Sequence, residues 1–147
     1  MLSRASKVIS TLWWSLIDWY TDNVSVLCVV GFVMGVTQLH DVVYIVCARS
    51  STISRFNART HQRLTDIDVK DLSVPWDIVA CERSSQIYVA DNEACIWRVS
   101  SDGEDIKRWP PKSPSDTFIS YTLSVTSTRL LVTSLTIIIT IIFFKVA

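Results

Sequence analysis

A repeat with a period of about 44 residues is the sequence feature that most constrains the fold of this chain. The segment VVYIVCARSSTISRF begins at Val42, and the similar segment QIYVADNEACIWRV begins at Gln86. Tyr44 and Tyr88 are corresponding residues, and a fainter copy, RLLVTS, places Val132 another 44 positions along the chain. A unit of this length that recurs is one supersecondary element, which buries its apolar faces by stacking on its neighbours.

Each unit is predicted to hold short antiparallel strands. The runs MGVTQL and VVYIVC are separated by the polar pair HD, and WDIVAC and QIYVA are separated by ERSS, which is the pattern of hairpins. TISRFN and RLTDIDV follow the first hairpin, ACIWRVS and IKRW follow the second, and TLSVT with RLLVT forms a third. Four short antiparallel strands per unit of about 44 residues are typical of a β-propeller blade.

Composition excludes several classes of function. The chain is 49% hydrophobic and 19% charged, and its net charge is zero because 14 basic residues balance 14 acidic ones. Nucleic-acid-binding domains usually carry a basic excess, so we expect no nucleic-acid partner. The sequence has no glycine-rich phosphate loop and no G-x-S-x-G motif. Neither His40 nor His61 can be matched with a nucleophile from the sequence, so we expect no enzymatic activity.

The cysteines indicate a reducing environment. None of the four stands in a C-x-x-C pair or at zinc-ligand spacing, and each lies in or beside an apolar run; they are Cys28, Cys47, Cys81 and Cys95. We therefore expect four reduced, buried thiols that act as small hydrophobic groups. This prediction favours a cytoplasmic location, with a membrane-associated location as the alternative.

The N-terminal segment is predicted to be an amphipathic helix over residues 4–20. Its apolar stripe is spaced for one side of a helix and consists of Val8, Ile9, Leu12, Trp13, Leu16, Ile17 and Tyr20. Three interpretations remain open. The helix covers an open edge or face of the main domain, it lies in a membrane interface, or it belongs to a signal peptide.

The C-terminal segment is apolar and rich in β-branched residues. Residues 135–144 contain only Leu, Ile, Thr and Phe. This composition suits a final strand, whereas extension of the apolar run back towards Leu123 gives a marginal membrane anchor that includes Arg129. Both alternatives stay open, so membrane attachment is expected to involve residues 1–20 or 130–147.

The best-formed unit, PWDIVACERSSQIYVADNEACIWRVSSDG, resembles the NHL repeat. The matching positions, in order, are Pro75, Ile87, Tyr88, Val89, Ala90, Asp91, Asn92, Ile96, Val99, Asp102 and Gly103. The resemblance is good over residues 75–109, partial over 34–67 and weak over 118–134, and Cys47 stands where the repeat has its Asp. It implies a six-bladed, TolB-like propeller superfamily, which includes calcium-dependent lactonases and esterases.

We therefore predict an all-β fold, a partial β-propeller of two to three four-stranded antiparallel blades. The predicted divisions are an N-terminal helix over 1–23, NHL-like blades over 24–134 and an isoleucine-rich tail over 135–147. Closed propellers have about 4–8 blades. The open blade edges of a shorter array are expected to allow self-association.

A calcium site is the main chemical candidate that the resemblance brings. Asp77 opens an inner strand, and Asp91 and Asn92 follow the next strand. Calcium requires about six to eight oxygen ligands, which a propeller gathers from several blades. We therefore expect no metal and no other cofactor, and we expect Asp91 to accept hydrogen bonds from turn amides.

The function predicted from the sequence is a non-catalytic protein-interaction module built from NHL-like blades. Tryptophan is enriched at binding hot spots, and Trp76 and Trp109 are the candidate contact residues, whereas Trp97 is expected in the core. The alternatives are a remnant of a calcium-dependent lactonase or esterase and a membrane-attached interaction protein. The sequence does not name the protein partner.

Overall fold

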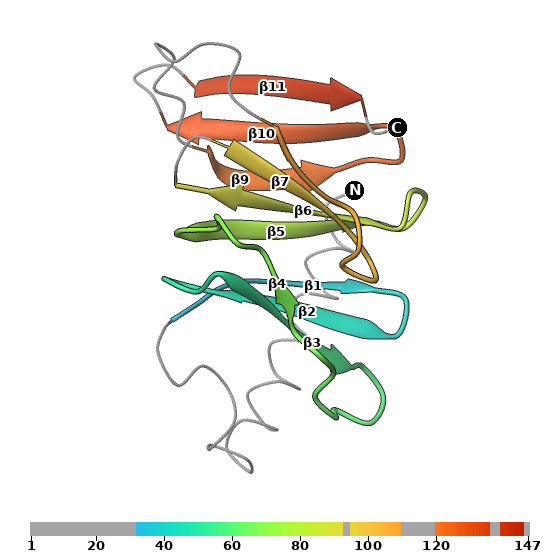
Figure 1. Cartoon of the computed structure of the whole chain (residues 1–147). Helices are drawn as coiled ribbons and strands as arrows, with labels where there is room; N and C mark the ends of the chain where they lie inside the picture. Colours follow the sequence, from blue (N-terminus) through green and yellow to red (C-terminus); the bar gives the residue numbers. More distant parts are fainter. Residues whose placement is uncertain (1–31, 93–94, 110–119, 136–138, 146–147) are drawn as a thin grey trace. The chain divides into compact units, whose positions relative to one another are not determined.

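The structure of the chain is a computed structural model, which describes residues 32–92, 95–109, 120–135 and 139–145. This part of the chain forms three antiparallel β-sheets, which we call blades 1, 2 and 3 in chain order (Figure 1). Sequence neighbours pair within each sheet, so every blade is a meander. The helix predicted over residues 4–20 lies outside the described residues.

Blade 1 follows the predicted strands closely. It consists of β1 (Val33–Leu39), β2 (Val42–Cys47), β3 (Thr52–Asn57) and β4 (Ile67–Asp68). The outer strand is much shorter than the run RLTDIDV suggested. In its place, separate residues meet β3: Arg63 forms an isolated bridge with Phe56, and the amide of Leu64 donates to the carbonyl of Arg55.

Blade 2 repeats this arrangement with a longer outer strand. It consists of β5 (Pro75–Cys81), β6 (Gln86–Asp91), β7 (Cys95–Ser100) and β8 (Ile106–Trp109). Each blade has an equivalent backbone hydrogen bond beside its inner strand, and this bond shows which residues of the two blades correspond. The amide of Ala48 donates to the carbonyl of Phe32 in blade 1, and the amide of Asn92 donates to the carbonyl of Val74 in blade 2.

Blade 3 contains the isoleucine-rich tail as a strand. It consists of β9 (Ser120–Val125), β10 (Arg129–Leu135) and β11 (Ile139–Lys145). β11 pairs with the whole of β10, from Arg129 opposite Lys145 to Leu135 opposite Ile139. The tail is therefore continuous with the blade, and the change of pattern expected at Ser134 falls inside β10. In the described ranges, no helix has the length and apolarity needed to cross a membrane.

The strand pairing corrects the alignment of the third repeat. Val89 lies opposite Ile78 in blade 2, and Val132 lies opposite Leu123 in blade 3. All four side chains are buried and face the preceding blade. Val132 therefore corresponds to Val89, and Leu131 corresponds to Tyr88. The sequence alignment was wrong by one residue, which in a strand exchanges the two faces of the sheet.

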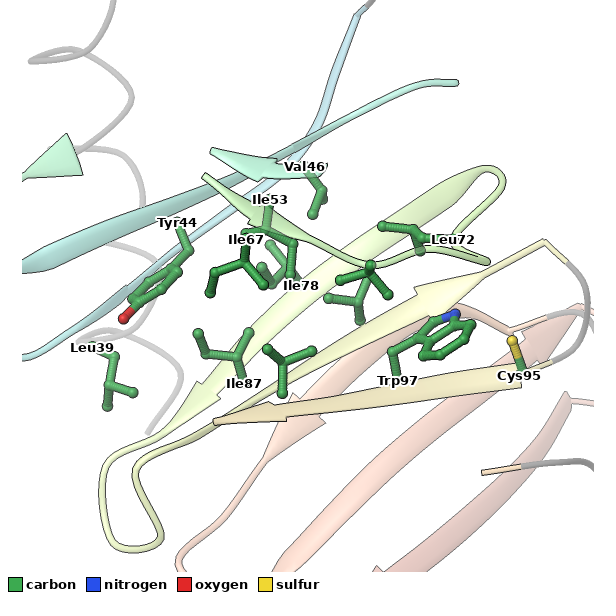
Figure 2. Packing of buried hydrophobic residues seen from close by; sticks show 13 residues of the cluster. Leu39, Tyr44, Val46, Ile53, Ile67, Leu72, Ile78, Ile87, Cys95 and Trp97 are labelled. Atoms are coloured by element: carbon green, nitrogen blue, oxygen red, sulfur yellow. The ribbon is translucent and has the colours of Figure 1, made fainter. Parts of the chain in front are cut away.

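Two apolar clusters hold the blades together, and we call them the first and second seams. The first seam lies between blades 1 and 2, as Figure 2 shows, and the second lies between blades 2 and 3. The first seam contains Leu39, Tyr44, Val46, Ile53, Ile67, Val69, Leu72, Ile78, Ile87, Val89, Cys95, Trp97 and Val99. The second contains Cys81, Tyr88, Ala90, Ile96, Leu123, Leu130 and Val132.

Strand β6 contributes to both seams, because successive side chains point to opposite faces of a strand. Ile87 and Val89 enter the first seam, whereas Tyr88 and Ala90 enter the second. All four side chains are almost completely buried. A strand covered on both faces carries a continuous apolar run, which explains why QIYVA shows no alternation of apolar and polar residues.

Close backbone approach and one tyrosine complete the first seam. A Cβ atom on Gly35 would lie 3.0 Å from the backbone nitrogen of Ile78, so glycine permits β1 to approach β5. The hydroxyl of Tyr44 donates to the carbonyl of Ser101 at 2.8 Å, which joins β2 to the turn after β7. The fold is thus a partial β-propeller of three stacked blades.

The corrected register predicts opposite sensitivities for two neighbouring residues. Val132→Ala should lower the free energy of unfolding by about 2 kcal/mol, because it removes methyl groups from a fully buried position of the second seam. Leu131→Ala should cost about half as much or less, although it removes more atoms, because Leu131 is only half-buried on the other face. Urea unfolding of both variants provides the measurement, and the reverse order would support the original alignment.

Candidate functional site

The carboxylate of Asp91 is the most highly coordinated polar group in the described residues. One oxygen, Oδ1, accepts from the amide of Val74 at 2.9 Å, the amide of Asn92 at 2.7 Å and the hydroxyl of Ser73 at 3.0 Å. The other, Oδ2, accepts from the amide of Ser73 and the indole of Trp97, each at 3.1 Å. The side chain is completely buried. Its contacts join the residues before β5 to β6 and β7.

Burial and hydrogen bonding shift the pKa of the Asp91 carboxyl group in opposite directions. Burial by itself raises the pKa of Asp91, because a charge is disfavoured away from water. The hydrogen bonds from Val74, Ser73 and Trp97 outweigh this effect, so the pKa of Asp91 lies below its usual range. Asp91 is therefore a buried anion held by protein donors, and its geometry agrees with the predicted contacts to turn amides.

Asp77 makes a different connection, between blades 2 and 3. Its Oδ2 accepts from the amide of Leu123 at 2.8 Å, and its Oδ1 accepts from the amide of Ile78 at 2.8 Å. Burial raises the pKa of Asp77 above its ordinary value, and these two amides partly oppose that shift. Asp77 was a candidate calcium ligand, and both of its carboxylate oxygens instead accept hydrogen bonds from backbone amides of the inner strands.

Asn92 and Trp76 form a pair beside Asp91. The indole nitrogen of Trp76 donates to Oδ1 of Asn92 at 3.2 Å. Asn92 is exposed, whereas Trp76 is half-buried and packs against the second seam. The structure therefore brings two of the residues singled out from the sequence together, and Asp91 joins them through the amide of Asn92.

Trp109 is less exposed than its position before two prolines suggested. It is half-buried against the second seam, and its ring lies 5.8 Å from that of Tyr88, tilted by 45°. Trp97 is a core residue, as predicted, and the guanidinium of Arg108 lies 5.8 Å from its ring. Trp76 and Trp109 therefore border the same seam from the inner and outer strands of blade 2.

The structure also brings together a pair that sequence reasoning missed. The Nε2 atom of His40, in the turn between β1 and β2, lies 3.4 Å from the hydroxyl of Ser85, in the corresponding turn of blade 2. Both residues have a positive φ, at 54° and 51°. The two residues lie in equivalent turns of the repeat, and this equivalence could have predicted their contact from the sequence. The pair is exposed and its contact is long, so it is a weak link between the two turns.

Ion pairs distribute the basic residues among acids. Arg59 pairs with Asp41, Arg63 with Asp66, and Arg98 with Asp105. Basic and acidic side chains are therefore interspersed on the surface, as expected of a chain with no net charge. Within the described ranges, no group of three or more His, Cys, Asp or Glu side chains is arranged to hold a metal ion.

The cysteines differ from the prediction at one position. Cys81 and Cys95 are buried thiols, as expected, and the thiol of Cys95 lies 4.0 Å from Oδ2 of Asp91. Cys47, at the end of β2, is disulfide-bonded. The expectation that all four thiols are reduced is therefore wrong for Cys47.

Comparison with known proteins supports the architecture. No family model matches the chain, and no curated protein matches it. A solved structure described as the crystal structure of a nidogen/laminin complex contains a similar chain, with a TM-score of 0.60 and 19% sequence identity. The match covers 71% of this chain and 40% of that one, so our chain spans less than half of its length. At this identity the likeness shows the fold alone, and it defines the protein as β-propeller-like.

Asp91→Asn should destabilise the protein by about 3 kcal/mol, because an amide replaces one acceptor oxygen and faces buried donors. The pH dependence gives a more specific readout. Because folding lowers the pKa of Asp91, its contribution is complete above its unfolded pKa of about 3.9 and is lost as the pH falls towards the folded pKa.

Urea unfolding of the wild type and Asp91→Asn between about pH 7 and pH 3 measures this contribution. The stability difference between the two proteins should shrink as the pH falls. Asp105→Asn is the control, because Asp105 is a half-exposed ion-pair partner of Arg98 and Lys107. A difference that stays constant with pH would contradict an anionic Asp91.

Calcium should leave the melting temperature unchanged, because Asp77 and Asp91 already accept hydrogen bonds from protein donors at both oxygens. Thermal melts with calcium and with excess chelator provide the measurement. A calcium-dependent rise in Tm that disappears in Asp77→Ala would contradict this expectation and favour the hydrolase remnant.

Proposed function

We propose that this chain is a non-catalytic protein-interaction module built from NHL-type propeller blades. The observation that carries the proposal is that the carboxylates of Asp77 and Asp91 are already bound by backbone amides. Asp77 and Asp91 hold backbone amides within and between blades, and neither presents its oxygens as a free general base or metal ligand. The surface features left for function are turns and aromatic edges, and these are the usual means of protein recognition.

The NHL assignment is supported by the role of Asp91. In the resembling segment, this Asp ends the second strand, and here its carboxylate contacts Ser73 and Val74, just before the inner strand. The same carboxylate accepts from Trp97 in the third strand. The carboxylate of Asp91 therefore anchors the residues that lead into β5, the first strand of blade 2. The NHL repeat has an Asp at the corresponding position.

The proposed contact surface is the exposed part of Trp76 and Trp109, with Asn92 between the strands that carry them. Both indoles border the second seam and are half-buried, so their orientations are fixed before a partner arrives. A pre-oriented aromatic side chain loses little conformational entropy on binding. The similar solved structure is a nidogen/laminin complex, in which the matched fold occurs in a protein–protein assembly.

Site-specific photo-crosslinking tests this proposal. A benzophenone amino acid at position 109 should crosslink a protein partner in cells, whereas the same group at Arg59 should not, because Arg59 is exposed but follows β3 in blade 1, outside the proposed surface on blade 2. Trp109→Ala should then weaken binding of the crosslinked partner by roughly 30-fold, the loss expected for a hot-spot tryptophan.

Two results would count against this surface. Equal crosslinking from positions 109 and 59 would show non-specific contact. Unchanged affinity in both Trp109→Ala and Trp76→Ala, with thermal melts that show folded protein, would place the binding surface elsewhere. Lys107→Ala, an exposed change on the same strand, is the matched control.

A further inference from the structure

Strand β11 is the third strand of blade 3, and its outer edge has no pairing partner among the described residues. In blade 1, β3 pairs with β2 on one edge and with β4 on the other, and in blade 2, β7 pairs in the same way with β6 and β8. β11 pairs with β10 along one edge and stands last in its sheet, as Figure 1 shows. The backbone N–H and C=O groups of the other edge, which we call the β11 edge, are therefore a template for a further strand.

The β11 edge lacks the features that protect the outer strands of the other two blades. β4 has two residues and includes Asp68, and β8 has four residues and includes Lys107 and Arg108. β11 has seven residues, ITIIFFK, and its one charged residue is Lys145 at the last position. Its pairing with β10 has no register shift, whereas the pair formed by the first two strands of each blade has one. A long, regular edge strand rich in β-branched residues pairs readily with another strand.

We propose that the β11 edge is a self-association site, at which the β11 strands of two copies of this chain pair antiparallel about a two-fold axis. Residues 139–144 carry no charge, so like-charge repulsion does not oppose pairing of the strand with itself. Pairing over the full length sets Ile139 of one copy opposite Lys145 of the other, and Ile142 opposite its own counterpart. The antiparallel orientation separates the two Lys145 residues by about 20 Å, whereas a parallel one would set them side by side.

This contact joins blade 3 of each copy into one continuous sheet. Both copies use the same edge, so the association closes at the dimer and does not propagate. Main-chain hydrogen bonds supply the affinity, as in other cases of strand addition. In this register Ile141 of one copy lies opposite Phe143 of the other, and a β-branched residue opposite an aromatic one is a favourable cross-strand pair. The contact uses blade 3, so it does not depend on the binding surface proposed on blade 2.

Sedimentation velocity of the intact chain tests the proposal. The wild type should change from a monomer to a species of twice the mass as its concentration rises from about 0.1 to 100 μM, the range in which a small interface dissociates. A wild type that stays monomeric over this range, or that forms species larger than the dimer, would overturn the proposal.

Two double variants identify the edge and its register. Positions 141 and 143 lie opposite Thr133 and Leu131, on the face of blade 3 away from the second seam, so charges there spare the core. Ile141→Lys with Phe143→Lys sets like charges opposite each other across the two-fold axis and should weaken the dimer about 10-fold or more. Ile141→Lys with Phe143→Glu sets opposite charges there and should restore most of the affinity at low salt.

Ser124→Lys is the matched control, because Ser124 is exposed on β9, the strand of blade 3 that lies farthest from β11, and it should leave the dimer unchanged. Hydrogen exchange of the wild type is a readout that requires no variant. The amides of residues 139–145 should exchange more slowly at high protein concentration than at low, whereas those of β8 should not change. Equal dimerisation of the two double variants, or exchange of residues 139–145 that is independent of concentration, would show that the β11 edge is not the contact.

Discussion

The buried carboxylate of Asp91 is the interaction on which blade 2 depends. Five N–H and O–H donors and the thiol of Cys95 surround it, and they come from the residues before β5, from the residue after β6 and from β7. Removal of the acceptor would leave these donors unsatisfied in a place that water does not reach, which costs more than the hydrogen bonds contribute in a native protein. The carboxylate therefore determines where the inner strand begins and how Trp97 enters the first seam.

This anchor positions strands that carry the packing energy. β6 is covered on both faces, and the seams on its two sides connect three sheets that bury little apolar surface alone. Polar contacts then specify the fit between sheets. Tyr44 reaches the carbonyl of Ser101 across the first seam, and Asp77 receives the amide of Leu123 across the second. The stack thus combines non-directional apolar burial with a few directional bonds that fix the relative places of the strands.

Most strands were predictable from the sequence, because short apolar runs between polar turns are a local signal. The third repeat was harder: nothing local distinguishes an alignment on Val132 from one on Leu131, and only the pairing of Val132 with Leu123 decides it. The tail had no periodicity to separate strand from helix, and the pairing of β11 with β10 supplied the answer. The contact between His40 and Ser85 and the half-burial of Trp109 against Tyr88 depend on tertiary packing, which one sequence does not reveal.

Corresponding positions in blades 1 and 2 carry different chemistry, because β2 ends at the disulfide-bonded Cys47 and β6 ends at the buried carboxylate of Asp91. The contribution of Asp91 depends on ionisation, so acid weakens it, whereas a disulfide at Cys47 does not titrate. Reductant acts in the opposite way, because it breaks a disulfide and leaves a carboxylate unchanged. Blades 1 and 2 therefore respond to different solution conditions even though their strands are alike. Since the first seam packs blade 1 on blade 2, loss of the hydrogen bonds to Asp91 removes support from a core that includes Tyr44, Val89 and Trp97.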